Sequence, residues 1–147
     1  MSKPPSIPYW HLWVDTDGVS RQTRCAMTEF DLSSIRPPAS PQWQGRTVSG
    51  AMTCLFTVLP VGWIGDWHPN PRPQWIVPLS GRWFVESMDG ARVELGQGEI
   101  SFGGDQAARK RDGKIGHRSG TVGAEAAVLM LVQFEDTPAP SAPCAFR

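Results

Sequence analysis

Glycine and proline recur at short intervals along the whole chain and leave little room for a helix. The 147 residues include 15 glycines and 14 prolines. Proline breaks a helix because it lacks an N–H donor and clashes with the preceding turn. The runs between these residues are short and rich in Val, Ile, Thr, Trp and Phe, which is typical of β-strands. The sequence therefore predicts an all-β protein of about nine or ten short strands, arranged as a sandwich or a barrel.

The length of the chain corresponds to one domain. We expect residues 9–135 to form this domain. Residues 1–8 are predicted to be a flexible arm, and residues 136–147, which are rich in Pro and Ala, to form a C-terminal tail that is disordered or lies over the surface.

Three local patterns predict individual elements. Asp89-Gly90 separates two strand-like runs and favours a hairpin with a type I′ turn. The run 126–135 is almost entirely apolar, so we expect a strand that is buried on both faces. Residues 103–116 are polar and rich in glycine, which indicates a loop. The basic residues Arg109 to Arg111 form either a solvated loop tip or a lid over the mouth of the fold.

The charge balance excludes some classes of partner. The chain has 14 Lys and Arg against 14 Asp and Glu. Nucleic acids and anionic membranes normally require a basic surface, so we expect neither as a partner. No apolar run approaches the roughly 20 residues that cross a membrane. A small molecule is the expected partner.

The cysteines predict a reduced protein. Cys25, Cys54 and Cys144 are odd in number and show no C-x-x-C spacing. A disulfide framework is therefore not expected, and Cys54 is interpreted as a buried strand residue. The first residues also lack the apolar core of a signal peptide. Together these features predict a cytoplasmic protein.

The stretch GWIGDWHPNPRPQWIVPLSG, residues 62–81, contains the best candidate site. In a strand, alternate side chains share one face, so Asp66, His68, Asn70 and Arg72 would form a polar row. Such a row faces either solvent or the interior of a small barrel. The seven tryptophans of the chain, against one tyrosine, indicate either core packing or a pocket for an apolar or aromatic molecule.

The spacing of this stretch resembles the first motif of the cupin superfamily, G-x5-H-x-H-x3–4-E-x6-G. Gly62, His68, Asn70, Gln74 and Gly81 occupy its positions.

The second cupin motif would begin at Gly98, and its histidine comes late, as His117. Over residues 9–135 the chain resembles short single-domain cupins that carry a DWHPxPRxQ stretch. This resemblance implies an antiparallel β-barrel of the jelly-roll type with an internal pocket, and a homodimer.

Two substitutions separate this chain from metal-binding cupins. Asn70 stands at the position of the second histidine, and Gln74 at that of the glutamate. Only His68 and His117 remain as strong ligands for a transition metal. Asp66 could add a carboxylate or orient His68. The resemblance therefore implies either no cofactor, or one divalent Fe, Mn, Ni or Zn ion held by His68, His117, Gln74 and Asp66.

The cupin resemblance, together with the loss of two metal ligands, implies an enzyme of specialised metabolism. Such an enzyme would transfer protons as an isomerase, cyclase, dehydratase or lyase. The substrate would be apolar or aromatic and carry a carbonyl group. His68 and His117 would be catalytic, because an imidazole exchanges protons at neutral pH. The residues expected to bind substrate are Asn70, Arg72, Gln74, Trp67 and Trp75. A metal-dependent oxygenase and a non-catalytic ligand-binding protein are the alternatives.

Overall fold

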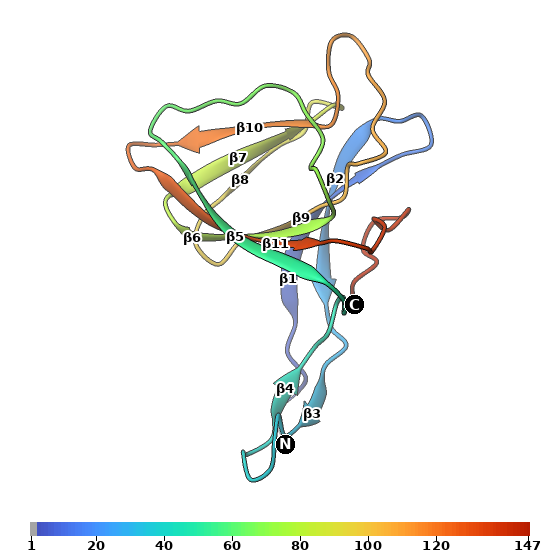
Figure 1. The fold of residues 1–147 in the computed structure, drawn as a ribbon, viewed down its shortest axis with the longest axis vertical. Coiled ribbons are helices and arrows are strands. Elements are labelled where there is room, and N and C mark those ends of the chain that lie inside the picture. The colour runs from blue at the N-terminus through green and yellow to red at the C-terminus, as the bar shows by residue number, and fades with distance from the viewer. Residues whose placement is uncertain (1–2) are drawn as a thin grey trace.

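The computed structural model describes residues 3–147 and shows eleven strands and no helix in that range (Figure 1). The all-β class is therefore confirmed. No helix long and apolar enough to cross a membrane occurs in these residues. The strands are β1 (Ile7–Val14), β2 (Ser20–Met27), β3 (Asp31–Ser33), β4 (Gln42–Gln44), β5 (Met52–Leu59), β6 (Gln74–Ser80), β7 (Arg82–Ser87), β8 (Arg92–Leu95), β9 (Ile100–Gly103), β10 (His117–Val122) and β11 (Ala127–Phe134).

The strands form two facing layers and one small hairpin. The larger sheet has the order β2-β1-β9-β6-β11-β5, and the second has the order β10-β7-β8. Figure 1 shows the second sheet over the larger one, with the β3–β4 hairpin projecting from the far end. The β1–β9 pair is parallel, and the other pairs are antiparallel. Across the described residues no strand ladder joins the two layers, so the barrel is not closed.

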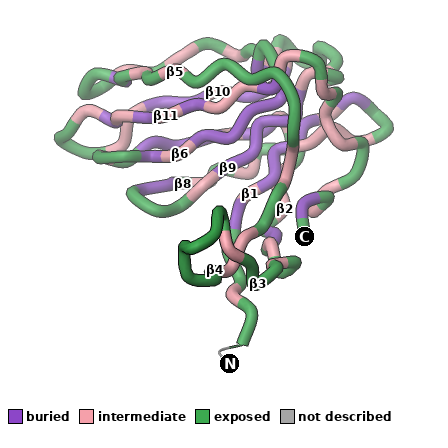
Figure 2. The backbone as a smooth tube through the Cα atoms, turned by 60° about the horizontal axis from the view of Figure 1, so that its bottom comes forward, coloured by how far each residue is buried: buried purple, intermediate pink, exposed green. Residues whose placement is uncertain are grey.

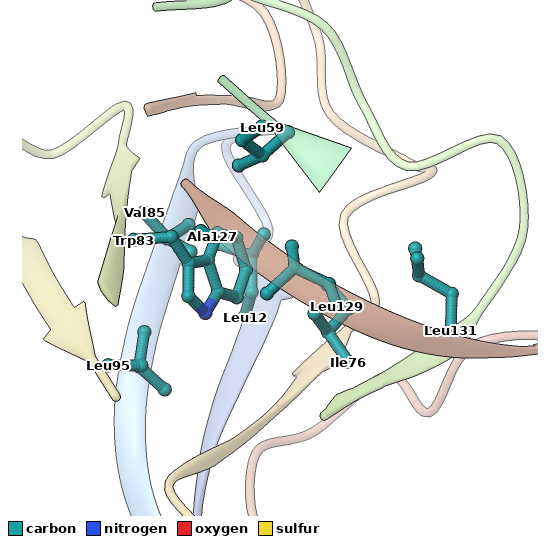
Figure 3. Packing of buried hydrophobic residues seen from close by; sticks show 9 residues of the cluster. All are labelled: Leu12, Leu59, Ile76, Trp83, Val85, Leu95, Ala127, Leu129 and Leu131. Carbon is teal, nitrogen blue, oxygen red and sulfur yellow. The ribbon is translucent and has the colours of Figure 1, made fainter. Parts of the chain in front are cut away.

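The main core lies between these layers. Its buried side chains come from both sheets (Figure 3): Leu12, Leu59, Ile76, Trp83, Val85, Leu95, Ala127, Leu129 and Leu131. Each fully buried Leu, Ile or Val side chain of this core stabilises the fold by about 1.5–3 kcal/mol. Figure 2 shows buried residues along β11, β6, β9 and β1, whereas β3 is exposed and β4 is exposed to half-buried. The core thus holds the two sheets together and leaves the hairpin outside.

Strand β11 confirms the predicted strand but corrects its burial. Ala127, Leu129 and Leu131 are buried against the second sheet, while Val128 and Met130 on the other face are only half-buried.

The hairpin of β7 and β8 is also confirmed, but its turn is not type I′. Such a turn needs a positive φ at both central residues, and here only Gly90 has one, at 89°.

A second aromatic cluster lies on the other face of the larger sheet, beneath the C-terminal tail. It contains Tyr9, Cys25, Trp75, Phe102, Phe134 and Phe146. The Tyr9 hydroxyl donates to the Phe146 carbonyl at 2.9 Å, and Phe146 packs on Phe102 at 4.6 Å between ring centroids. The tail therefore lies over the surface, which is one of the two alternatives predicted from the sequence.

The strand β1 starts at Ile7, inside the predicted arm, whose residues 1 and 2 lie outside the described part.

The cysteine prediction is wrong on two points. Cys25 and Cys144 form a disulfide that joins β2 to the tail across 119 residues of sequence. Cys54 is free and exposed on the edge strand β5. An odd number of cysteines does not exclude one pair, and the distant partners come together only because the tail folds back. The cysteines consequently give no support to a cytoplasmic location.

Candidate functional site

A cavity of about 230 Å³ lies between the two larger sheets. Its apolar wall consists of Leu55, Leu59, Trp63, Pro71, Ile76, Trp83, Leu129 and Leu131. Its polar residues are Thr57, His68, Asn70, Gln74, His117, Ser119 and Gln133. These lining residues include no Asp, Glu, Lys or Arg. The structure therefore brings both predicted catalytic histidines to one small, mostly apolar chamber.

The segment that carries His68 is not a strand. It pairs with β10 through isolated bridges, of which one joins His68 to His117 by reciprocal backbone hydrogen bonds of 2.9 and 3.0 Å. Gly116 permits this contact, because a Cβ atom there would lie 2.4 Å from the Pro69 nitrogen. The predicted polar row along one strand face is thus wrong, although His68 and Asn70 both still line the cavity.

The carboxylate of Asp105 fixes the orientation of the His117 ring by a hydrogen bond. The carboxylate is fully buried, and its Oδ2 lies 2.7 Å from Nδ1 of His117. Burial alone would raise the pKa of Asp105, but the hydrogen bond and charge of His117, with two bonds from Asn70, together lower that pKa below its ordinary value. Asp105 is therefore a carboxylate at neutral pH. Since a carboxylate only accepts, Nδ1 of His117 carries the proton.

A chain of amides continues from Asp105 along the cavity wall. Asn70 donates its backbone N–H and Nδ2 to Oδ1 of Asp105, both at 2.8 Å. Gln74 donates Nε2 to Oδ1 of Asn70 at 2.6 Å, and Gln133 donates Nε2 to Oε1 of Gln74 at 2.8 Å. The direction of each bond follows from the ionised carboxylate at the end of the chain. The oxygens of Asn70 and Gln74 are thus occupied within the protein.

His68 is held by a different group. Its Nδ1 lies 2.7 Å from the backbone oxygen of Asp66. A carbonyl oxygen only accepts, so Nδ1 of His68 also carries a proton. Asp66 therefore orients His68 through its backbone. The rings of His68 and His117 have centroids 4.8 Å apart and an interplanar angle of 51°. When neutral, each of these two histidines therefore has an unprotonated Nε2, whose lone pair can accept a hydrogen bond or a proton.

Three predicted substrate-binding residues lie outside the cavity lining. Arg72 pairs with Glu135, with Nε 2.9 Å from Oε2. Trp75 belongs to the aromatic cluster beneath the tail and donates Nε1 to Thr47 at 3.1 Å. Trp67 packs against the cationic ends of Lys114 and Arg118. These are respectively 5.2 and 5.7 Å from the ring centroid. The tryptophans that line the cavity are Trp63 and Trp83.

The basic loop is tied to the rest of the molecule. Arg109 donates to the Thr16 carbonyl at 2.8 Å, and Arg111 donates to the Asp17 carbonyl at 2.7 Å. Both bonds fasten the loop to the turn between β1 and β2. None of the three basic residues lines the cavity.

Asp105 and Gln133 are members of the hydrogen-bond chain that the sequence prediction missed. Gln133 had a signal, since it interrupts the apolar run 126–135. Asp105 follows two glycines directly after the predicted strand ISF, where a buried carboxylate and a solvated loop residue look alike in sequence. Its partner Asn70 lies 35 residues away, so no local spacing connects the two.

Comparisons with known proteins give little context. No family model matches the sequence, and no curated protein matches it. Among solved structures, the protein NMB1881 from Neisseria meningitidis is similar, with 16% sequence identity and a TM-score of 0.43. The similarity covers 63% of this chain and 84% of that one.

Proposed function

We propose that this protein is a small-molecule enzyme that catalyses proton transfer, with His117 as general base. The observation that carries the proposal is the buried Asp105–His117 pair at the wall of the cavity. A carboxylate behind an imidazole fixes its tautomer and stabilises the imidazolium that forms when the ring accepts a proton. Asp105 thus acts as a positioning residue for His117.

The proposed reaction begins at the unprotonated Nε2 of His117. Nε2 of His117 removes a proton from the carbon next to a substrate carbonyl, and the electrons of that C–H bond move to the carbonyl oxygen. Return of a proton at another carbon gives isomerisation, and loss of a leaving group gives elimination. His68 is the second acid–base group. The second hydrogens on the amide nitrogens of Gln74 and Gln133 supply donors for the substrate oxygen.

Exchange of substrate protons in deuterated water tests this proposal before the natural substrate is known. Acetophenone, β-tetralone and benzoylacetone are suitable probes, because each is neutral and has an acidic C–H beside a carbonyl. We expect the protein to accelerate exchange at this carbon for at least one probe, measured by NMR. His117→Ala and Asp105→Asn should each slow the exchange by about 100-fold or more.

Arg72→Gln is the matched control, because Arg72 binds Glu135 and does not line the cavity. This variant should exchange at the wild-type rate. Retained exchange in both His68→Ala and His117→Ala would exclude the proposed chemistry. Tight binding of a probe without any exchange would favour a non-catalytic ligand-binding protein.

One observation favours a metal-dependent oxygenase as the second candidate. Both Nδ1 atoms are bonded to oxygen acceptors, which is how metal-binding histidines are usually oriented. The donor set nevertheless fits poorly, because the Gln74 oxygen accepts from Gln133 and Asp105 is bonded to His117 and Asn70. Within residues 3–147 no group of three His, Cys, Asp or Glu could hold an ion.

Metal content of the untagged protein separates the two candidates. The oxygenase requires close to one equivalent of Fe, Mn, Ni or Zn, and a gain in Tm when that ion is added. Less than about a tenth of an equivalent, with no gain in Tm, would exclude it.

We also propose that the fold is a cupin jelly roll and that the protein is a homodimer. The fold proposal is supported by Gly62, Gly81 and Gly98, which stand at the motif glycines and have positive φ of 76°, 71° and 82°. A dimer is supported by β5, an edge strand with Phe56 and Val58 exposed. Light scattering of the wild type and of Phe56→Glu tests it. A dimer should dissociate in this variant.

A further inference from the structure

The paired histidines restrict what a ligand can present to them. The carbonyl of Asp66 and the carboxylate of Asp105 each require a proton on Nδ1. Nε2 of neither histidine has a hydrogen-bond partner among the described residues. The polar end of the cavity therefore offers two acceptors whose rings are 4.8 Å apart. A ketone or ether oxygen only accepts, so a group that bonds to these atoms must bring its own hydrogen.

The walls of the cavity restrict the charge of the ligand. No permanently charged side chain lines it. The nearby cations are also engaged: Arg118 binds Glu86 at 2.8 Å, and Arg72 binds Glu135. A carboxylate or phosphate would therefore lose its hydration without gaining a counter-ion, and this cost is large in an apolar environment. The cavity accordingly favours a ligand that enters without a charge.

The size and the walls restrict the body of the ligand. A volume of about 230 Å³ is below the usual range for drug-sized ligands, about 300–1,000 Å³. Trp63 and Trp83 provide aromatic surface, and Leu55, Leu129 and Leu131 provide aliphatic surface. A body of one or two rings fits this volume and composition.

We propose that the ligand of this cavity is a neutral, ring-sized phenol or enol that donates its hydroxyl to Nε2 of His117. On binding, the O–H bond breaks and an N–H bond forms on His117. The products are a phenolate or enolate beside an imidazolium, and Asp105 balances the positive charge. This inference deepens the proposed function, since an enolate is the intermediate of the proposed proton transfer, and it rests on the same cavity.

Three matched probes test the inference without any turnover. Para-nitrophenol carries the hydroxyl and has a coloured anion, para-nitroanisole replaces the hydroxyl by a methyl ether, and para-nitrobenzoate carries a permanent charge. Affinities are measured by calorimetry at a pH about one unit below the pKa of free para-nitrophenol. We expect para-nitrophenol to bind about tenfold or more tightly than either other probe, which corresponds to one hydrogen bond to a group that becomes charged.

Proton transfer is read separately from the absorbance of the bound phenolate. The wild type should raise the anion fraction of para-nitrophenol severalfold, and Arg72→Gln should do the same. His117→Ala and the conservative His117→Gln should abolish the rise, and Asp105→Asn should reduce it. An unchanged Tm in at least one His117 variant keeps this comparison valid. Equal affinity for all three probes, or an anion fraction that His117→Gln leaves unchanged, would overturn the inference.

The outcomes also separate this inference from the proposed function. Ketone exchange without preferential phenol binding would overturn the ligand class and leave the proton-transfer function intact. Phenol binding with ionisation, but without exchange of any ketone, would support the ligand class and contradict catalysis.

Discussion

At the scale of single residues, Asp105 determines what His117 can do. Motif spacing predicted His68, because the cupin-like pattern fixes its distance from Gly62. His117 was assigned to the second motif although it comes later in the sequence than that motif expects. The spacing of the first motif assigned Asn70 and Gln74 to the substrate, whereas their oxygens bond within the protein. Sequence could not decide this, because the amide orientation depends on Asp105, whose burial arises only when the loop 104–116 folds against β10.

His11 gives a pH prediction at the same scale. It is fully buried, accepts the Cys144 N–H at Nδ1, and has no partner at Nε2. Burial lowers the pKa of His11 from 6.5 to about 4. The unfolded chain therefore binds a proton between these values while the folded protein does not. The free energy of unfolding should therefore be unaffected by His11 above about pH 6.5. It should fall by about 3 kcal/mol as the pH decreases to 4.

Urea unfolding at several pH values measures this effect, and His11→Phe is the comparison. The variant loses the titrating ring but keeps an aromatic side chain beside Phe102 and Phe146. The pH dependence between 6.5 and 4 should become clearly flatter in the variant. Identical slopes in both proteins would show that His11 is not the group that titrates.

At the scale of elements, the regular strands were predictable and the connection that forms the site was not. Alternation and apolar runs identified β7, β8 and β11, because strand packing leaves a local pattern in the sequence. The segment 62–73 also alternates, with polar residues at 66, 68, 70 and 72, but it forms no regular strand. It is held by bridges to β10, more than forty residues later, and by the absence of a side chain at Gly116.

Gly116→Ala tests the contact between these two segments. Gly116 has φ 73°, and a Cβ there would lie 2.5 Å from the carbonyl carbon of His68. We expect the His68 segment to move away from β10, with a loss of about 2–3 kcal/mol in unfolding free energy and of ketone exchange. Urea unfolding and NMR exchange measure the two effects.

Gly113→Ala is the control for backbone strain alone. Gly113 has φ 78° in the same loop, and a Cβ there would meet nothing within 4 Å. This variant should lose only about 1 kcal/mol and retain exchange. Equal losses in the two variants would mean that strain, and not displacement of His68, explains the effect.

At the scale of the whole molecule, the cavity and the tail lie on opposite faces of the larger sheet. The all-β class follows from composition, but the disulfide that fastens the tail could not be predicted, because its cysteines are 119 residues apart.

Cys144→Ser should lower the unfolding free energy by about 2–5 kcal/mol, since the bond restricts a long loop in the unfolded chain. Ligand binding in the cavity should persist. Loss of para-nitrophenol binding in a folded Cys144→Ser protein would show that the two faces are coupled.

The tautomers of the histidines test the central claim most directly, and the chain has only three histidines. Long-range ¹H–¹⁵N NMR at neutral pH distinguishes protonated from unprotonated ring nitrogens. His68 and His117 are predicted to carry their proton on Nδ1, and His11, whose Nδ1 accepts from Cys144, to carry it on Nε2. Asp105→Asn should weaken the preference in His117 alone. A proton on Nε2 of His117 in the wild type would contradict the proposed base and the ligand class that depends on it.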